Sequence, residues 1–278
     1  MKKLIVSGDS CTEPFFYSSL HPDKDFDFPK WADHVGKHLG MEVINLARGG
    51  AGNEFIYSSI QDVILQIPKE EIGLVIAGWT QSHREDWEQG KKDHWPYVNI
   101  AKSPWVTPWR SQRVSKSGDI FNWVRKSLRT YIAFQNLCEN NNLPYVHFQM
   151  GDIFENYLSG LRANDTEKSK GITYKKEYEG NFETDLTYII KLLLRYDTHI
   201  KKFIGWPGVS KEMMLLIKDW PLSHRESFTM HSHILGHNVQ ELNNNGLTIS
   251  KLDDHPNEDG HKAIAKFIIQ QLDNIENM

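Results

Sequence analysis

The chain has 278 residues, 24% of them charged, and a formal net charge of -4. This length suits one large α/β domain or two small ones, and the acidic balance excludes the basic surface that neutralises nucleic-acid phosphates. Its two cysteines, Cys11 and Cys138, are too few for a disulfide framework or a zinc pattern. No apolar stretch approaches the roughly 18 residues of a membrane span, and the apolar run near the start is too short for a secretion signal. We therefore expect a cytoplasmic or particle-associated protein with no nucleic-acid partner and no membrane span, its oligomeric state left open.

The first 80 residues alternate short apolar runs with helical patterns, which is typical of a parallel sheet covered by helices. A first helix is expected after Pro29 and before Gly40, and a second begins at Asn53, whose side chain suits an N-cap, and ends before Pro68. Three short apolar runs are interpreted as buried strands: Leu4 to Val6, Val43 to Ile44, and residues 73–78 (GLVIAG).

The rest of the chain is less regular. Residues 80–118 show little periodicity and are interpreted as a functional insertion, because structureless loops of this length are uncommon. Further elements are expected as a helix over about 121–138, a strand over 143–150, helices over about 183–204 and 209–218, and a final helix from Pro256. The remainder of 151–250 is interpreted as a lid or subdomain. The pattern predicts a single domain over 1–278, with three α/β/α layers and a short parallel sheet.

Four polar segments fall where strands of this sheet end or where the final helix begins. Loops at the carboxyl ends of parallel strands converge, so these segments are expected to meet. Together they supply a hydroxyl, flexible glycine backbone, a hydrogen-bond donor, and a carboxylate beside a histidine. Acyl transfer needs these parts: an imidazole to activate the serine, a carboxylate to orient the imidazole, and donors for the oxyanion. The segments are GDS (8–10), NLARGGAGN (45–53), GWTQ (78–81) and DDHPN (253–257).

These segments resemble the SGNH (GDSL-type) hydrolase family over about the first 80 residues and the last 30. The resemblance implies the flavodoxin-like fold of that family, with Ser10 as nucleophile and His255 as base. Gly50 stands five residues after Asn45, as the family's second-block glycine does, so the N–H groups of Ser10 and Gly50 are the implied oxyanion donors. The resemblance implies no metal and no organic cofactor.

Two departures from the family pattern change the expected roles. The third block, Gly-x-Asn-Asp in the family, reads GWTQ here, so Thr80 stands in place of the asparagine and is expected to be the third oxyanion donor. Leu252 occupies the family's aspartate position three residues before His255. Asp253 or Asp254 must then orient the imidazole. Asp253 is favoured because the side chain of an immediate neighbour usually points away.

The substrate is expected to be a small acyl ester, such as an O-acetyl group on a carbohydrate. Trp79 and Arg84 are candidate substrate-binding residues, since indole faces stack on sugar rings and a guanidinium holds anionic or carbonyl groups. Six of the nine tryptophans fall within residues 79–123, where they serve equally well as the core of an insertion. A salt bridge is the alternative for Arg84. The alternative function is a catalytically impaired module that binds glycans or is structural, favoured by both departures.

Other reactive-looking residues have simpler interpretations. Asp9 is expected to fix a turn, Cys11 to point away from the site as the neighbour of Ser10, and His261 to be a cap or packing residue. One histidine cluster has spacings that a metal site could use, but no cysteine or close carboxylate accompanies it, so no metal site is expected. Its members are His224, His231, His233 and His237.

Overall fold

The protein is described by a computed structural model that covers residues 1–82, 84, 86–88, 105–106, 120–151, 153, 182–206, 208–209, 228–236, 246–250 and 253–276. A five-stranded sheet of order β2-β1-β3-β6-β7 lies at its centre, and each neighbouring pair of strands is parallel. The strands are β1 (Lys3–Ser7), β2 (Glu42–Asn45), β3 (Ile72–Trp79), β6 (Tyr145–Gln149) and β7 (Phe203–Ile204).

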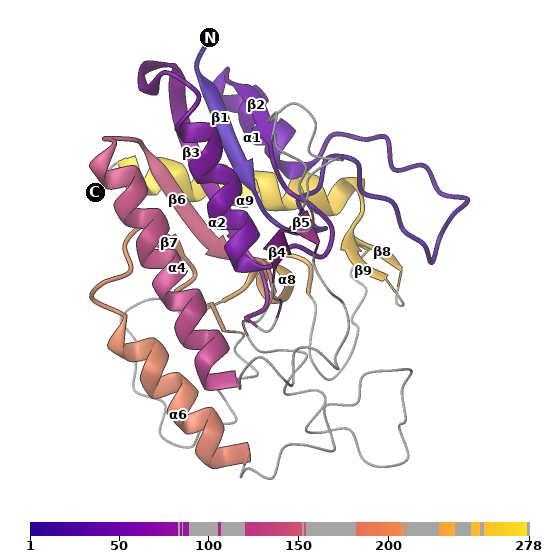
Figure 1. The fold of residues 1–278 in the computed structure, drawn as a ribbon. Helices are drawn as coiled ribbons and strands as arrows, with labels where there is room; N and C mark the ends of the chain where they lie inside the picture. The colour runs from indigo at the N-terminus through magenta and orange to yellow at the C-terminus, as the bar shows by residue number, and fades with distance from the viewer. Residues whose placement is uncertain are drawn as a thin grey trace, which may run out of the picture.

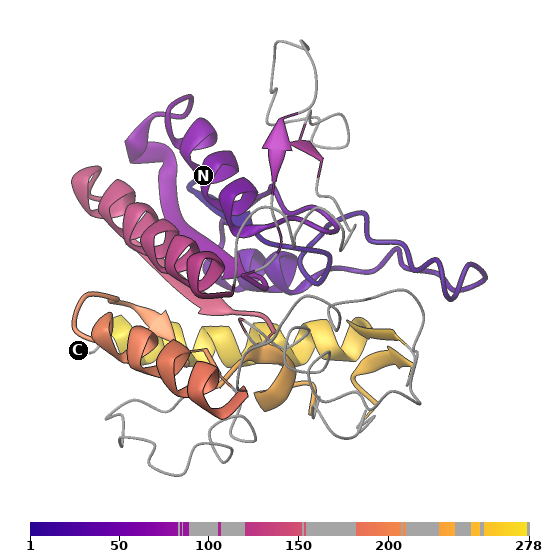
Figure 2. The same cartoon turned by 60° about the horizontal axis from the view of Figure 1, so that its bottom comes forward.

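Helices cover both faces of this sheet (Figures 1 and 2). On one face α1 packs along α9, and on the other α2 packs against α4, with α6 beside α4. The layers are therefore α/β/α, as the sequence pattern predicts. The helices are α1 (Trp31–Leu39), α2 (Asn53–Ile64), α4 (Ile120–Asn140), α6 (Phe182–Arg195), α8 (Met230–His233) and α9 (Glu258–Glu276), with a 3-10 turn, η1, at Lys69–Glu71.

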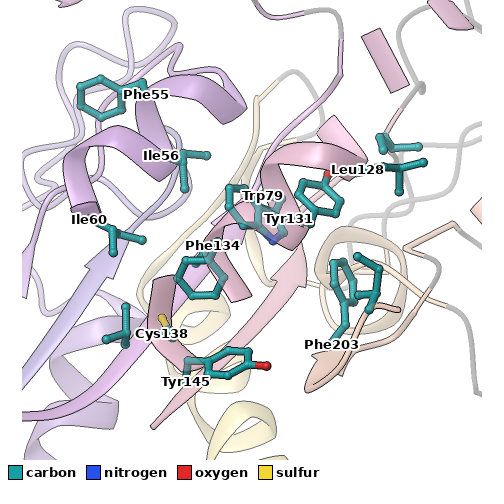
Figure 3. Close-up of a cluster of buried hydrophobic side chains, with 14 of the residues drawn as sticks. Phe55, Ile56, Ile60, Trp79, Leu128, Tyr131, Phe134, Cys138, Tyr145 and Phe203 are labelled. Carbon is teal, nitrogen blue, oxygen red and sulfur yellow. The ribbon is translucent and has the colours of Figure 1, made fainter. Parts of the chain in front are cut away.

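The face under α2 and α4 is filled by aliphatic and aromatic side chains (Figure 3). Trp79, the last residue of β3, has no exposed surface. Its ring stacks on Tyr131 with centroids 4.6 Å apart and meets Phe134 edge-on at 5.5 Å. The indole N–H donates to Nδ1 of His147 over 3.0 Å, which satisfies a polar group that would otherwise be costly to bury. This core fixes the carboxyl end of β3.

Two expected boundaries are wrong. The helix expected over about 183–204 ends at Arg195, because the chain turns through Asp197 and His199, Lys202 takes a φ of 50°, and β7 follows. The final helix begins at Glu258 rather than at Pro256, which is the last residue of β9 (Asp253–Pro256). The helix expected over about 209–218 lies outside the described residues, apart from Val209.

The insertion expected over 80–118 and the lid expected within 151–250 lie mostly outside the described residues and stay predictions. Of the first, the structure describes a short antiparallel pair, β4 (Trp87–Glu88) with β5 (Trp105–Val106). Of the second, α6 and β7 belong to the central sheet and its covering layer. Within the described ranges, no helix is both long and apolar enough to cross a membrane.

The fold brings the two distant parts of the chain together. β1 and β3 are neighbours, with Ser7 opposite Ala77, so the segments that follow these strands emerge side by side. At the other end of the chain, β8 (Thr248–Ser250) pairs antiparallel with β9, which leads into α9. Because α9 packs on α1, β9 is carried to the same edge of the sheet.

Candidate active site

Ser10, His255 and Asp253 form a chain of hydrogen bonds at this edge. Ser10 Oγ lies 2.7 Å from Nε2 of His255, and Nδ1 of the same ring lies 2.6 Å from Oδ1 of Asp253. The backbone N–H of His255 also donates to that carboxylate oxygen, over 3.2 Å. Asp253 is buried, whereas Ser10 and His255 are partly exposed. The structure thus brings together the three residues named as catalytic.

The sequence left Asp253 and Asp254 as alternatives for the residue that orients the imidazole. Asp254 is 43% exposed at its side chain, and its nearest carboxylate oxygen lies 3.8 Å from Nδ1 of His255, beyond hydrogen-bond distance. Residues two apart on a strand point to the same side, and Asp253 and His255 are so placed on β9. The geometry favours Asp253 as the hydrogen-bond partner and leaves Asp254 as a nearby charge.

The charges around His255 favour its protonated form. Burial lowers the pKa of His255, but the hydrogen bond with Asp253 and the charges of Asp254, Asp253 and Asp9 outweigh it and raise the pKa above the ordinary 6.5. Burial also raises the pKa of Asp253, yet the hydrogen bonds from His255 and Ser18 bring it down to about 2. A carboxylate that stays ionised can stabilise the imidazolium that forms when Ser10 gives up its proton.

A tight turn after β1 presents Ser10. The N–H of Thr12 donates to the carbonyl of Asp9 over 2.9 Å, and the N–H of Cys11 donates to the Asp9 carboxylate over 3.1 Å. A side chain at Gly8 would place its Cβ 2.5 Å from the Thr12 hydroxyl, so only glycine fits. Asp9 therefore fixes the turn, which is the role expected from the sequence.

The Asp9 carboxylate also accepts a hydrogen bond from the Thr80 hydroxyl, and this bond changes the expected role of Thr80. Thr80 is buried, and its Oγ1 donates to Oδ2 of Asp9 over 2.8 Å. A hydroxyl has one proton to donate, so in this arrangement Thr80 does not offer the third oxyanion donor that the sequence comparison implied. Thr80 instead joins the end of β3 to the turn that carries Ser10.

The two expected substrate contacts, Arg84 and Trp79, are engaged within the protein. Arg84 Nη1 lies 3.3 Å from Asp9 Oδ2, and its side chain is 15% exposed, so it forms a largely buried ion pair, the alternative that the sequence left open. Trp79 is wholly buried in the core, so the expectation that its ring face contacts a sugar is wrong. Its position at the end of an apolar strand fits a core residue as well as a ligand contact.

Asn53 has a role that the sequence did not reveal. It was expected to cap α2, but Gly52 is the N-cap and Asn53 is the first helical residue. Its side-chain oxygen accepts the Thr80 N–H over 2.9 Å, and its amide donates to the Thr80 carbonyl over 3.2 Å. Gln149 donates to the same carbonyl over 2.7 Å. The backbone at the end of β3 is thus held by two amide side chains from α2 and β6.

The helix α2 is capped by a carboxylate from the segment after β3. Asp86 accepts the N–H of Gly52 over 2.8 Å and the N–H of Phe55 over 2.9 Å. Burial raises the Asp86 pKa to about 6, although these two donors act to lower it. Because Gly50 lies two residues before the N-cap, Asp86 also restrains the loop of the second expected oxyanion donor.

Gly50 occupies the loop expected to carry that donor. Its φ of 75° lies in the left-handed region that favours glycine. The same loop lies against the nucleophile turn, since the N–H of Arg48 donates to the carbonyl of Gly8 over 3.1 Å. The role of the Gly50 N–H as an oxyanion donor stays a prediction.

Cys11 and His261 lie close to the site without replacing its members. Burial raises the pKa of Cys11 well above the usual thiol value, and its Sγ lies 3.2 Å from Nε2 of His231. His261 accepts the N–H of Trp31 at the start of α1 over 3.2 Å, and burial lowers its pKa to about 3. A neutral, buried imidazole in this position caps the helix, as expected.

Two members of the histidine cluster, His231 and His233, lie in the part that the structure describes, and each contacts another residue. His231 contacts Cys11, and His233 stacks on Phe228 with centroids 4.4 Å apart. His224 and His237 lie outside the described residues. Among those described, one group has ligand atoms close enough to hold a cation, and its members are Asp253, Asp254 and His255. Two of these side chains already bond to each other, which suits the hydrogen-bond chain with Ser10.

Comparisons with known proteins find likenesses among solved structures. No family model and no curated protein matches the chain. Among solved structures it is similar to a protein from Desulfitobacterium hafniense DCB-2 that is provisionally assigned to a lipolytic G-D-S-L family. The identity is 11%, the TM-score is 0.44, and the match covers 98% of this chain and 99% of that one. The α/β/α assignment rests on the sheet and its layers described above.

Proposed function

We propose that the protein is a serine hydrolase of the SGNH type that cleaves a small acyl ester through an acyl-enzyme. The observation that carries this proposal is the hydrogen-bond chain from Ser10 through His255 to Asp253. It joins a partly exposed hydroxyl to an imidazole of raised pKa and a carboxylate of lowered pKa. It also lies at the carboxyl edge of a parallel sheet, where ligands bind in open α/β folds.

The proposed reaction uses the three side chains in turn. Ser10 Oγ attacks the ester carbonyl while Nε2 of His255 takes the hydroxyl proton, and the Asp253 carboxylate stabilises the resulting imidazolium. The tetrahedral intermediate collapses, the alcohol leaves with the proton from His255, and the acyl group remains on Ser10. A water molecule then repeats the sequence and releases the acid. The backbone N–H groups of Ser10 and Gly50 are the proposed oxyanion donors.

The proposed substrate class is esters of small acyl groups. An O-acetylated carbohydrate remains the proposed example, although Trp79 and Trp123 are buried and do not supply the sugar-stacking faces. The second candidate function is a catalytically impaired module that binds glycans or is structural. The Thr80 hydroxyl favours it, because its proton is committed to Asp9 and the family's third donor is missing.

Labelling with a fluorophosphonate probe distinguishes the two functions. We expect the wild type to be labelled once, at Ser10, and to turn over p-nitrophenyl acetate. Ser10→Ala should lose both signals, because no other described group is placed to give up a proton to His255. Cys11→Ser is the matched control and should keep labelling, since the Cys11 thiol is buried. A wild type that neither labels nor turns over ester would favour the binding module.

The pH dependence of turnover should report His255. The base must be neutral to accept a proton, and its raised pKa keeps it protonated to higher pH. We therefore expect kcat/KM to rise with pH through a midpoint above 6.5. Asp254→Asn removes a charge that raises this pKa but leaves the Asp253 hydrogen bond, so its midpoint should move to lower pH. Glu70→Gln, an exposed residue of η1 before β3, should leave the midpoint unchanged, and equal midpoints in all three proteins would contradict the assignment.

A further inference from the structure

The segment between the nucleophile turn and α1 lies on the hairpin that carries the acid and the base. We call residues 13–28 the clasp. Nε2 of His21 lies 2.8 Å from the Ser250 hydroxyl, and Nζ of Lys24 donates to the Ile249 carbonyl over 2.9 Å. Figure 2 shows the clasp, in indigo, projecting on the side of the β8–β9 hairpin. Both contacts reach β8, so the clasp and the hairpin are joined at more than one point.

Alternate residues of the clasp face the hairpin. Phe15 and Tyr17 are 82% and 60% exposed. Phe16, between them, stacks on the His255 ring with centroids 4.3 Å apart and an interplanar angle of 27°. Ser18 is buried, and its hydroxyl donates to Oδ2 of Asp253. One side of this short stretch therefore contacts both the base and the acid of the proposed reaction.

The contact with Ser18 completes the hydrogen bonding of the Asp253 carboxylate. Oδ1 accepts the ring and backbone N–H groups of His255, and Oδ2 accepts the Ser18 hydroxyl. The hydrogen bond from Ser18 also acts to lower the pKa of Asp253. A buried carboxylate oxygen without a donor is costly, and a carboxylate held at one oxygen alone can turn about its bond to the chain. The hydrogen bond from Ser18 satisfies the second oxygen and keeps the Asp253 carboxylate from turning.

We propose that Ser18 is a positioning residue that holds Asp253 in the orientation in which it bonds to His255. The inference rests on the proposed function and extends it to a residue that no family motif contains. Asp253 reaches His255 from two residues away on one strand. Ser18, from a distant part of the chain, donates the hydrogen bond that fixes Oδ2 of Asp253. Ser18 touches no reacting atom and acts through Asp253.

Ser18→Val and Ser18→Thr form a matched pair, since the two side chains have the same shape and only threonine keeps the hydroxyl. We expect kcat of Ser18→Val to fall about tenfold relative to Ser18→Thr, the usual size of a lost hydrogen bond to a charged group, with KM unchanged. Ser18→Ala, which adds no bulk to the buried site, should lose as much kcat as Ser18→Val. Thermal unfolding of each variant shows whether a lower kcat comes from loss of the fold or, at unchanged stability, from a misplaced Asp253 carboxylate.

An NMR titration of His255 tests the same inference without a substrate. The Nδ1–H proton bonded to Asp253 should give a far-downfield resonance in the wild type and in Ser18→Thr, and that resonance should weaken in Ser18→Val and Ser18→Ala. The His255 pKa should fall in the last two, because the hydrogen bond with Asp253 raises it. Equal resonances and equal pKa values in the threonine and valine variants would overturn the role of Ser18. Absence of esterase activity in a wild type with the downfield resonance would overturn the proposed function alone.

Discussion

Replacing His255 with alanine is expected to lower kcat/KM for p-nitrophenyl acetate by at least about a thousandfold, the size of loss seen when a catalytic base is removed from a serine hydrolase. The structure gives the reason, because Nε2 of His255 lies 2.7 Å from Ser10 Oγ. Without the imidazole the hydroxyl keeps its proton and stays a weak nucleophile. The measurement is steady-state hydrolysis, together with the rate of labelling by a fluorophosphonate probe, which should fall in parallel.

His199→Ala is the matched control for this experiment. His199 is exposed and precedes β7, so it lies near the amino ends of the strands, whereas the site lies at their carboxyl ends. Its replacement removes a histidine of the same chemistry and should leave turnover within a factor of about two of the wild type, as expected of an exposed position. Turnover that survives in His255→Ala, or that falls equally in both variants, would contradict the role of His255 as base.

Replacing Trp79 with alanine is expected to lower the free energy of unfolding by about 3–5 kcal/mol, the range for large aromatic-to-alanine changes in a core. The side chain has no exposed surface and stacks on Tyr131. Its loss would also leave Nδ1 of His147 without the indole donor. Urea unfolding followed by circular dichroism measures the change. Because Trp79 precedes Thr80 directly, kcat should fall as well, with little change in KM.

Phe15→Ala is the control for Trp79→Ala, since both changes remove an aromatic ring and Phe15 is 82% exposed. Its free energy of unfolding should stay within about 0.5 kcal/mol of the wild type. A residue that contacted a sugar from the surface would behave differently from a core residue, raising KM on replacement and leaving stability nearly unchanged. That pattern for Trp79 would contradict the core position described here.

The regular part of the fold could be predicted from local patterns. Apolar runs at β1, β2, β3 and β6 and the helical stripes between them identify a parallel sheet, because each pattern is contained in a few neighbouring residues. The end of α6 could not be found in this way. Apolar residues continue past Arg195, and only the pairing of Phe203 with His147 of β6 shows that a strand has begun.

The residues of the site likewise fall into those that short sequence motifs predict and those that only the structure shows. Ser10 and His255 stand in recognisable short motifs, and the rule that strand ends converge is enough to place them together. Thr80 was misjudged because its motif position gives the residue type but not the acceptor toward which its hydroxyl turns. Ser18 and Asp86 had no signal at all, since each lies in an irregular segment. Their partners, Asp253 and the N-terminus of α2, belong to other parts of the chain.

The bond between Ser10 and His255 joins residues 245 positions apart. On the ribosome, β1, β2 and β3 are therefore synthesised long before His255. The apolar face of α1 has no α9 to pack against until the end of the chain is made. Contacts between such distant residues are slow to form, since the chain entropy of closing the loop opposes them. In refolding from urea, helical ellipticity should recover before esterase activity. The delay would measure the time that the β8–β9 hairpin needs to bring His255 into contact with Ser10.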